Sequence, residues 1–353
     1  MTRRYALRGN RVTRATFAGL LALTAAVGFG PKAMAEEVVN IYSYREPGLI
    51  QEILDAFTAE TGIKTNIVYN KNGLIERMTA EGRNSPADIL LVNDSGLLIQ
   101  AKDAGVTQPM ESKAVDELVD ARFRDPDHHW VAFTQRARVV YASKERVAQD
   151  AITYEELADP KWRGKVCSRS GQHTYNIALI ASMIAHHGEA ETEKWLTGVR
   201  DNLARKPAGG DREGARDVYA GLCDIAIGNT YYMVAMMKKE ETRPAAESVK
   251  VLFPNADGRG THVNVSGGAL AAHAPNRDNA VKLVEFFLAR KSQESYVGKS
   301  GEYPVIKGAE PSDIVKSWGE LKPDALSIAE IAAHRKKASE LVDKVRFDAG
   351  PAS

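Results

Sequence analysis

The sequence lacks the patterns that mark several common classes of enzyme. It contains no Walker pattern for phosphate binding, and the glycine pair at positions 209 and 210 stands in too short a turn to form a phosphate loop. Nucleophile elbows, triad spacings and paired catalytic carboxylates are absent as well. We therefore expect a protein that is not an enzyme.

The first 35 residues have the composition of a secretory signal peptide. Five arginines and no acidic residue lie within positions 1–14, an apolar run follows over about 15–29, and a small-residue cleavage site, Ala-Met-Ala, occupies 33–35. The apolar run is short for a membrane span, which disfavours a membrane anchor. We expect cleavage after Ala35 and export of the remaining chain.

The exported chain has no excess of basic charge. The first 35 residues hold six of the 47 basic residues and none of the 46 acidic ones, so 41 basic residues remain and the net charge becomes −5. A general nucleic-acid binder needs a basic face, so nucleic acid is not an expected partner. No later stretch is long and apolar enough to span a membrane, and the 318 remaining residues suffice for two domains.

Cysteine is scarce, since the chain has only Cys167 and Cys223. Each precedes a tyrosine by eight residues, Tyr175 and Tyr231 respectively. Two strands that deliver two ligands to one site would run side by side and could bring these sulfurs together, and an exported chain matures in an oxidising compartment. A disulfide is the leading interpretation, with two separate buried thiols as the alternative. A catalytic thiol beside His173 has no third group to orient it.

Strand and helix patterns alternate along the exported chain. The first half predicts three strands, at 38–43, 64–69 and 88–92, each followed by an amphipathic helix, at 49–60, 74–81 and 96–104. Two short strands, at 131–134 and 138–142, then resemble a crossover. A second alternating region and a helical tail over about 311–345 follow. This order favours parallel strands covered by helices.

We therefore expect two α/β lobes with a ligand cleft between them. The N-terminal lobe would comprise 36–134 and 260–309, and the C-terminal lobe 135–259 and 310–353. Ligand sites favour domain interfaces and the carboxyl ends of sheet strands. Polar turns that contain Tyr175 and the pair Tyr231-Tyr232 follow strand signals in the second lobe, so these side chains are expected to face the cleft.

The three tyrosines have the chemistry of a site for a hard cation. A phenolate is a hard, anionic oxygen ligand, and three phenolates would balance the charge of a ferric ion. A free tyrosine has a pKa near about 10, so the metal would have to displace the protons. Two adjacent tyrosines alone are more often packing residues, and their positions in the rest of the chain raise the odds of a binding role.

Four segments carry a resemblance to a known family. They read Ile-Tyr-Ser-Tyr-Arg-Glu-Pro at 41–47, Pro-Ala-Asp-Ile-Leu at 86–90, Leu-Ala-Asp-Pro-Lys-Trp-Arg-Gly-Lys-Val at 157–166, and Asn-Thr-Tyr-Tyr at 229–232, the last in combination with Tyr175. In these segments, and over nearly all of the exported chain, the sequence resembles the periplasmic ferric-ion-binding proteins that serve ABC transporters. The third segment is common to the wider superfamily, whereas the tyrosines are specific to the iron-binding family.

The resemblance implies both a fold and a function. The fold would be α/β, a two-lobed periplasmic binding protein of type II, with each lobe a mixed, mostly parallel sheet flanked by helices. Tyr175, Tyr231 and Tyr232 would be tyrosinate ligands of Fe³⁺. The protein would act in the periplasm as a monomer and deliver its iron to an ABC transporter permease in the inner membrane.

The first lobe departs from several members of that family. Some relatives add a histidine and a glutamate there, and this chain has Glu46 and Asn93 near those places. Others have a tyrosine in the first loop, where this chain has Pro47, although Tyr44 is close by. We therefore expect three tyrosines together with a synergistic anion such as carbonate, and Tyr44 is a candidate first-lobe contact.

An arginine is expected to hold that anion. The resemblance implies this role for Arg136, which lies on the expected crossover, and Arg45 is a second candidate. A guanidinium would balance the charge of an anionic iron–carbonate group and grip a planar anion with two parallel hydrogen bonds. The alternative is a binding protein of the same fold for a small organic anion, a phosphonate or a polyamine, because aromatic-lined clefts bind such ligands too.

Overall fold

The computed structural model describes residues 1–2 and 37–351. The expected signal peptide, residues 1–35, lies outside the described part apart from its first two residues, so it stays a prediction. Residues 36–353 form a unit of their own, and the following description concerns this unit.

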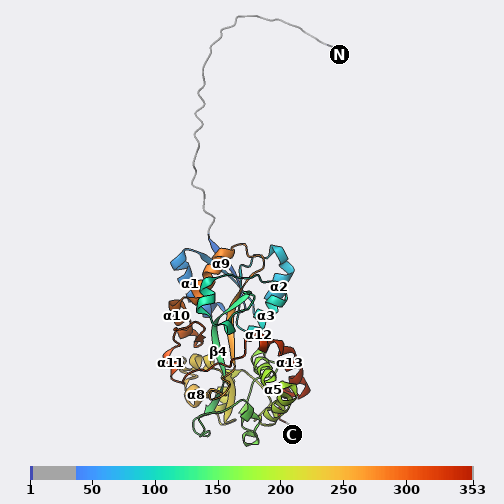
Figure 1. Ribbon diagram of the computed structural model, residues 1–353, viewed down its shortest axis with the longest axis vertical. Helices are drawn as coiled ribbons and strands as arrows, with labels where there is room; N and C mark the ends of the chain where they lie inside the picture. The colour runs from blue at the N-terminus through green and yellow to red at the C-terminus, as the bar shows by residue number, and fades with distance from the viewer. Residues whose placement is uncertain (3–36, 352–353) are drawn as a thin grey trace. The chain divides into compact units, whose positions relative to one another are not determined.

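A single curled, mixed sheet of nine strands runs through the unit (Figure 1). Its main path follows the order β2-β1-β3-β8-β4-β6-β5, while β7 and β9 both pair with β4. The strands are β1 (Val38–Ser43), β2 (Lys64–Tyr69), β3 (Ile89–Val92), β4 (Trp130–Ser143), β5 (Val166–Cys167), β6 (Ile225–Asn229), β7 (Val249–Leu252), β8 (Val263–Leu270) and β9 (Tyr303–Pro304).

The first lobe is built on the three strands that the sequence predicts. Strand β1 lies between β2 and β3 and is parallel to both. The helices of this lobe are α1 (Pro47–Thr61), α2 (Leu74–Glu81), α3 (Ser95–Asp103), α4 (Lys113–Leu118), α9 (Arg277–Leu288) and α10 (Arg290–Ser300). The predicted alternation of strand and helix is therefore confirmed here.

Helix α1 illustrates how the sequence determines these elements. Pro47 occupies its first turn, where a missing amide hydrogen breaks no helical bond, and Gly62, with a φ of 76°, ends it. Its buried side chains recur every three or four residues, and they are Ile50, Ile53, Leu54 and Phe57. Burial of each of these side chains contributes roughly 1.5–3 kcal/mol.

Strand β4 corrects the expectation of two short strands at 131–134 and 138–142. It is one continuous strand of 14 residues, and all of them are buried. Its first part pairs with β8 and its second part with β6 and β7. The polar residues that suggested an interruption remain in the strand because they have partners, as when Gln135 Nε2 donates to the carbonyl oxygen of Pro304 at 3.0 Å and Arg136 Nη1 donates to Ser266 Oγ at 3.1 Å.

The second lobe surrounds the far part of β4. Its helices are α5 (Thr174–Asp201), α6 (Asp211–Tyr219), α7 (Thr230–Met237), α8 (Arg243–Glu247), α11 (Asp313–Lys316), α12 (Ile328–Ala333) and α13 (Arg335–Lys344). Helix α5 contains a kink at Gly188, whose φ is 75°. No helix in the described part of the chain has the length and apolar character needed to cross a membrane.

Strand direction follows a simple rule in this sheet. The pairs β1–β2, β1–β3 and β5–β6 are parallel, whereas every pair that includes β4 or β8 is antiparallel. The sheet is mixed, as expected, but parallel pairing predominates only away from β4 and β8. Strand β4 joins the two parts of the sheet, because its first part pairs with β8 and its second part with β6 and β7.

The two cysteines form the predicted disulfide. Cys167 ends β5 and Cys223 lies just before β6, and their Cα atoms are 5.9 Å apart. Strands β5 and β6 are parallel, with Cys167 opposite Ala226. The alternatives of two free buried thiols and of a catalytic thiol are therefore wrong, and the two strands run side by side toward the tyrosines.

Candidate metal centre

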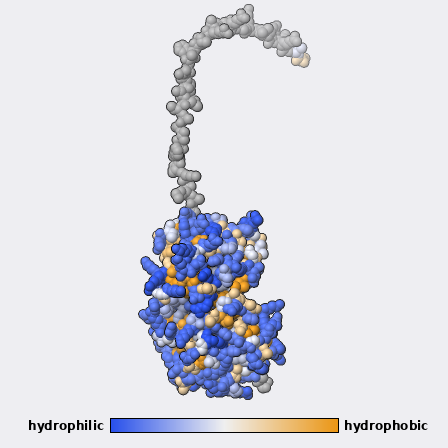
Figure 2. Space-filling view, viewed as in Figure 1, coloured by the Kyte–Doolittle hydropathy of each residue, from blue (hydrophilic) through white to orange (hydrophobic). Residues whose placement is uncertain are grey.

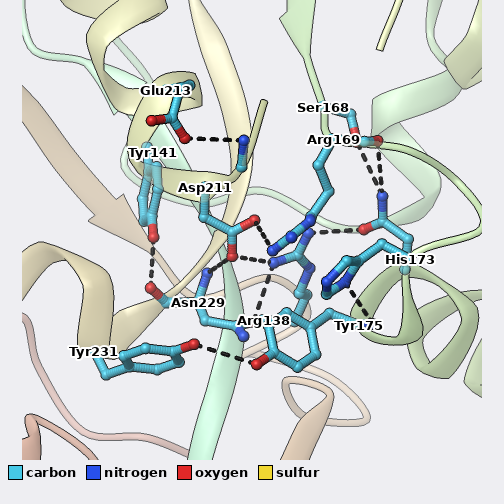
Figure 3. A network of polar contacts seen from close by, with 12 residues as sticks. Arg138, Tyr141, Ser168, Arg169, His173, Tyr175, Asp211, Glu213, Asn229 and Tyr231 are labelled. Atoms are coloured by element: carbon cyan, nitrogen blue, oxygen red, sulfur yellow. Dashed lines mark hydrogen bonds and ion pairs between the residues drawn. The ribbon is translucent and has the colours of Figure 1, made fainter. Parts of the chain in front are cut away.

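Three tyrosines meet beyond the carboxyl ends of β5 and β6. Tyr175 lies in the first turn of α5, and Tyr231 and Tyr232 lie in the first turn of α7. The hydroxyl oxygens of Tyr175 and Tyr231 are 3.3 Å apart (Figure 3). The ring centroids of Tyr231 and Tyr232 are 4.1 Å apart. The structure thus brings together the three residues that the sequence singled out.

The local fold explains why the tyrosines converge. Because β5 and β6 are adjacent and parallel, the segments that leave them emerge at the same edge of the sheet. Helix α7 begins directly after β6, and α5 begins after a short turn that follows β5. Both helices therefore place their N-terminal ends at the site, where the partial positive charge of a helix favours anionic ligands such as phenolates.

A buried polar network fixes the starts of the two helices (Figure 3). Arg138 Nη1 lies 2.6 Å from Asp211 Oδ2 and also donates to Asn229 Oδ1 at 3.1 Å. Its Nη2 donates to Asn176 Oδ1 at 2.7 Å. Asn176 follows Tyr175, and Asn229 ends β6, so one guanidinium links both tyrosine-bearing segments. Arg138 is therefore a structural residue.

The environment of the tyrosines opposes ionisation in the absence of metal. Burial raises the pKa of Tyr231 well above its usual value, and the neighbouring phenols Tyr175 and Tyr232 raise it further. Burial also raises the pKa of Tyr232, as do Tyr175 and Asp211. The hydroxyl groups of Tyr231 and Tyr232 are therefore protonated at neutral pH until a cation displaces the protons.

Guanidinium groups lie against the rings of Tyr175 and Tyr232. The Cζ atoms of Arg136 and Arg169 lie 5.2 and 5.3 Å from the ring centroid of Tyr175. The Cζ atom of Arg212 lies 4.8 Å from the ring centroid of Tyr232. These positive charges make deprotonation of the phenols less costly once a metal binds, and they would hold an anion at the same place.

The tyrosines open into a cleft with a volume of about 520 Å³. First-lobe residues that line the same cleft include the candidate contacts Tyr44 and Arg45, and also Glu46 and Asn93. Arg136 of β4 lines it as well, together with all three tyrosines. All the site residues that the sequence analysis proposed therefore line one cleft, namely Tyr44, Arg45, Arg136, Tyr175, Tyr231 and Tyr232.

Tyr44 is part of the cleft wall, but its hydroxyl is already engaged. Its oxygen accepts a hydrogen bond from the backbone amide of Ile75 at 3.0 Å, at the start of α2. Burial raises the pKa of Tyr44. Among the described residues no hydrogen bond joins it to the tyrosine cluster.

Two buried arginines and one buried glutamate form the floor of the cleft beside the tyrosines. Arg45 Nη2 lies 2.7 Å from Glu302 Oε2. Arg136 donates to Ser266 Oγ at 3.1 Å and to the carbonyl oxygen of Asn93. Burial opposes ionisation of Glu302, but Arg45 and Arg136 hold its pKa below the usual value, so it is a carboxylate.

Sequence reasoning missed Glu302. It stands between Gly301 and the short strand β9, in a stretch without a metal or anion motif. Only the folded chain, which brings residue 302 beside residues 45 and 136, identifies it.

The donor set fits a hard, highly charged cation. In the described part of the chain, no group of three or more histidine, cysteine, aspartate or glutamate residues is arranged to hold a metal ion. The tyrosine cluster instead offers three oxygen donors, which prefer a hard cation to a soft one. Glu46 is exposed and Asn93 is half-buried, and both line the cleft.

The chain belongs to a family of bacterial extracellular solute-binding proteins, whose model matches residues 84–320. It is 40% identical over 313 residues to iron uptake protein A1 of Synechocystis sp., covering 88% of this chain and 87% of that protein. Among solved structures, a Bordetella ferric binding protein is 51% identical with a TM-score of 0.85, covering 88% of this chain and 100% of that one. A Trichodesmium protein in complex with iron and citrate ligands is 37% identical with a TM-score of 0.85, covering 88% and 99%. The two-lobed fold that the sequence predicts is confirmed.

Proposed function

We propose that the protein is a periplasmic receptor that captures Fe³⁺ through Tyr175, Tyr231 and Tyr232 and delivers it to an ABC transporter permease. The observation that carries this proposal is the convergence of three phenol groups at one edge of the sheet, inside a cleft. The names of the similar proteins, an iron uptake protein and a ferric binding protein, support it. The protein acts as a monomeric carrier and catalyses no reaction.

The charges of the site favour an anion beside the metal. Three phenolates neutralise Fe³⁺ and occupy three of its coordination positions, which leaves room for further oxygen ligands. A synergistic anion such as carbonate fills these positions, and Arg136 balances its charge with hydrogen bonds to its oxygens. The citrate in the Trichodesmium complex supports an exogenous oxygen ligand in general, and it leaves the choice between anions to experiment.

We assign residues 36–134 and 260–309 to the first lobe and residues 135–259 and 310–353 to the second. A change of partners within β4 supports a division close to this one, since residues up to Ala137 pair with β8 and residues from Arg138 onward pair with β6, which puts the change three residues after Thr134. The cleft then lies between the lobes, and the second lobe supplies all three tyrosines.

The visible spectrum of the purified protein tests this function. Iron bound to tyrosinate is orange to red, so loading with Fe³⁺ should produce a visible band that a chelator together with a reductant abolishes. Tyr231→Phe removes one hydroxyl group and keeps the ring, so the band and the iron affinity should fall together while the fold persists.

Tyr219→Phe is the matched control, because Tyr219 is 58% exposed and lies at the end of α6. This variant should retain wild-type colour. A colourless wild-type protein in the presence of excess Fe³⁺ would contradict the proposal. Tight binding of a phosphonate, an organic anion or a polyamine by such a colourless protein would favour the alternative receptor function.

A further inference from the structure

Two buried arginines, Arg45 and Arg136, lie close to one buried carboxylate, that of Glu302, on the floor of the cleft. The side chains of Arg45, Arg136 and Glu302 are 7%, 1% and 2% exposed, and all three line the cleft. Ser266 Oγ accepts hydrogen bonds from both arginines and so holds the two guanidinium groups close together. The group carries two positive charges and one negative charge, so one positive charge is left over.

The carboxylate is paired with Arg45. Two nitrogens of Arg45 donate to Glu302, Nη2 to Oε2 at 2.7 Å and Nη1 to Oε1 at 3.4 Å. The shortest approach of Arg136 Nη1 to Glu302 is 3.8 Å, and no carboxylate of the described residues lies within hydrogen-bond distance of Arg136. Arg136 therefore carries the uncompensated charge.

The aromatic neighbours of the two arginines agree with this division. The Cζ atom of Arg45 lies 5.2 Å from the ring centroid of Tyr296, a buried side chain of α10. The Cζ atom of Arg136 lies 5.2 Å from the ring centroid of Tyr175, one of the three candidate ligands. Arg136, which carries the uncompensated charge, thus lies beside the candidate metal centre. Arg45, whose charge Glu302 neutralises, lies against Tyr296 instead.

We propose that Glu302 is a positioning residue that reserves Arg136 for the synergistic anion by pairing with Arg45, an inference that rests on the proposed ferric-ion function. Glu302 itself contacts neither the metal nor the anion. It sets the net charge of the cleft floor at +1, which is enough to hold one anion beside a neutral iron–tyrosinate group.

This role predicts opposite effects for the two halves of the ion pair. Glu302→Gln keeps the shape of the side chain and removes its charge, so the floor gains a positive charge and binds the anion more tightly. Arg45→Met leaves Glu302 with Arg136 as its only cation, so the floor loses its net charge and the anion binds more weakly. The double variant restores the net charge of the wild type.

The experiment titrates the iron-loaded protein with bicarbonate. Apo protein receives one equivalent of ferric chloride in bicarbonate-free buffer, and the visible iron–tyrosinate band is followed as sodium bicarbonate is added. Compared with wild type, the half-saturating bicarbonate concentration should fall about tenfold in Glu302→Gln and rise about tenfold in Arg45→Met, as expected for one nearby charge at a partly buried site. The double variant should lie within about threefold of wild type, because its net charge is unchanged.

Thr134→Val is the control for a purely structural role. Thr134 donates a hydrogen bond to Glu302, so its loss perturbs the same buried group without a change of charge. This variant should lower the melting temperature and leave the half-saturating concentration unchanged. If Glu302→Gln and Arg45→Met both weaken anion binding, the inference is overturned, because a structural network would respond in that way.

The outcomes separate this inference from the proposed function. A wild-type protein without a visible band contradicts the ferric-ion function, and a wild-type band that ignores bicarbonate contradicts carbonate as the anion. A responsive wild-type band with unaltered midpoints in both single variants contradicts only the role of Glu302. If Glu302→Gln does not fold, Arg45→Met and the double variant decide, since the double variant must bind bicarbonate about tenfold more tightly than Arg45→Met.

Discussion

The individual tyrosine side chains define what this site can bind. Tyr175, Tyr231 and Tyr232 line one cleft, and the hydroxyl oxygens of Tyr175 and Tyr231 are 3.3 Å apart. Guanidinium groups, which keep their charge at every accessible pH, lie against the rings of Tyr175 and Tyr232. Burial raises the pKa of Tyr231 and of Tyr232, so the empty site holds protons. Metal binding is therefore an exchange of one trivalent cation for protons.

This exchange predicts a steep dependence of iron binding on pH. Lowering the pH favours the protonated phenols and so weakens binding, by up to about a thousandfold per pH unit if three protons are displaced. Raising the pH has the opposite effect until the phenols ionise without metal. Bound iron should be measured by absorbance and by metal analysis after equilibration at pH values from about 8 down to about 4. This range spans the usual pKa values of carboxyl and imidazole groups.

The expected result is a release curve that is steeper than a single titration. A curve that follows one proton would mean that only one phenolate is formed on loading. The exposed-tyrosine variant Tyr219→Phe should give the wild-type curve, because its hydroxyl group is remote from the exchange.

Among the structural elements, the adjacent strands β5 and β6 matter most. They aim α5 and α7 at the same point, the Arg138 network ties their ends together, and the disulfide joins the strands covalently. The bonded cysteines are 56 residues apart in sequence. A cross-link over such a separation restricts the unfolded chain and so stabilises the folded one.

Removal of the disulfide should therefore destabilise the protein and loosen the site. We expect the Cys167→Ser, Cys223→Ser double variant to lose about 2–4 kcal/mol of free energy of unfolding, measured on metal-free protein by chemical denaturation. Iron should bind more weakly as well, because the two strand ends are held together less firmly.

Reductant provides the internal control for this prediction. It should shift the unfolding midpoint of the wild-type protein toward that of the variant and leave the variant unchanged. Equal stability of the wild type with and without reductant would mean that the bond contributes nothing, and mass spectrometry without reductant should first find the two cysteines joined.

At the scale of the whole molecule, strand β4 connects the lobes, since it pairs with β8 in its first part and with β6 in its second. A second link joins the end of β3 to the start of α5, since Arg335 Nη2 lies 3.2 Å from Asp94 Oδ1 and also donates to Thr174 Oγ1. Thr174 precedes Tyr175, so the position of the first lobe and the position of a candidate ligand are coupled. Figure 2 shows a largely hydrophilic surface with hydrophobic residues gathered across the middle of the unit.

Much of this arrangement could be predicted from the sequence. The alternation of strand and helix patterns predicts the lobes, and the matched eight-residue spacing from Cys167 and Cys223 to their tyrosines predicts adjacent strands. Both signals come from residues that are close together in the sequence. The candidate ligands could be predicted for the same reason, because Tyr175 follows β5 and the pair Tyr231-Tyr232 follows β6.

Other features depend on contacts between distant residues and carry no local signal. The continuity of β4 depends on partners such as Glu302, more than 160 positions from Thr134, which accept hydrogen bonds from its polar side chains. The pairing of Arg45 with Glu302 joins residues that are 257 positions apart. The sequence offered Arg45 and Arg136 as candidates for the anion, and only the folded chain shows that Glu302 lies closer to Arg45 than to Arg136.

The central claim is that one ferric ion binds to three tyrosine oxygens in this cleft. A crystal structure of the iron-loaded protein, with anomalous diffraction data collected on both sides of the iron absorption edge, tests it most directly. We predict a single anomalous peak within bonding distance of the hydroxyl oxygens of Tyr175, Tyr231 and Tyr232, with an anion between the peak and Arg136. An iron peak that is bonded to none of these oxygens, in a protein that still takes up stoichiometric iron, would contradict the account.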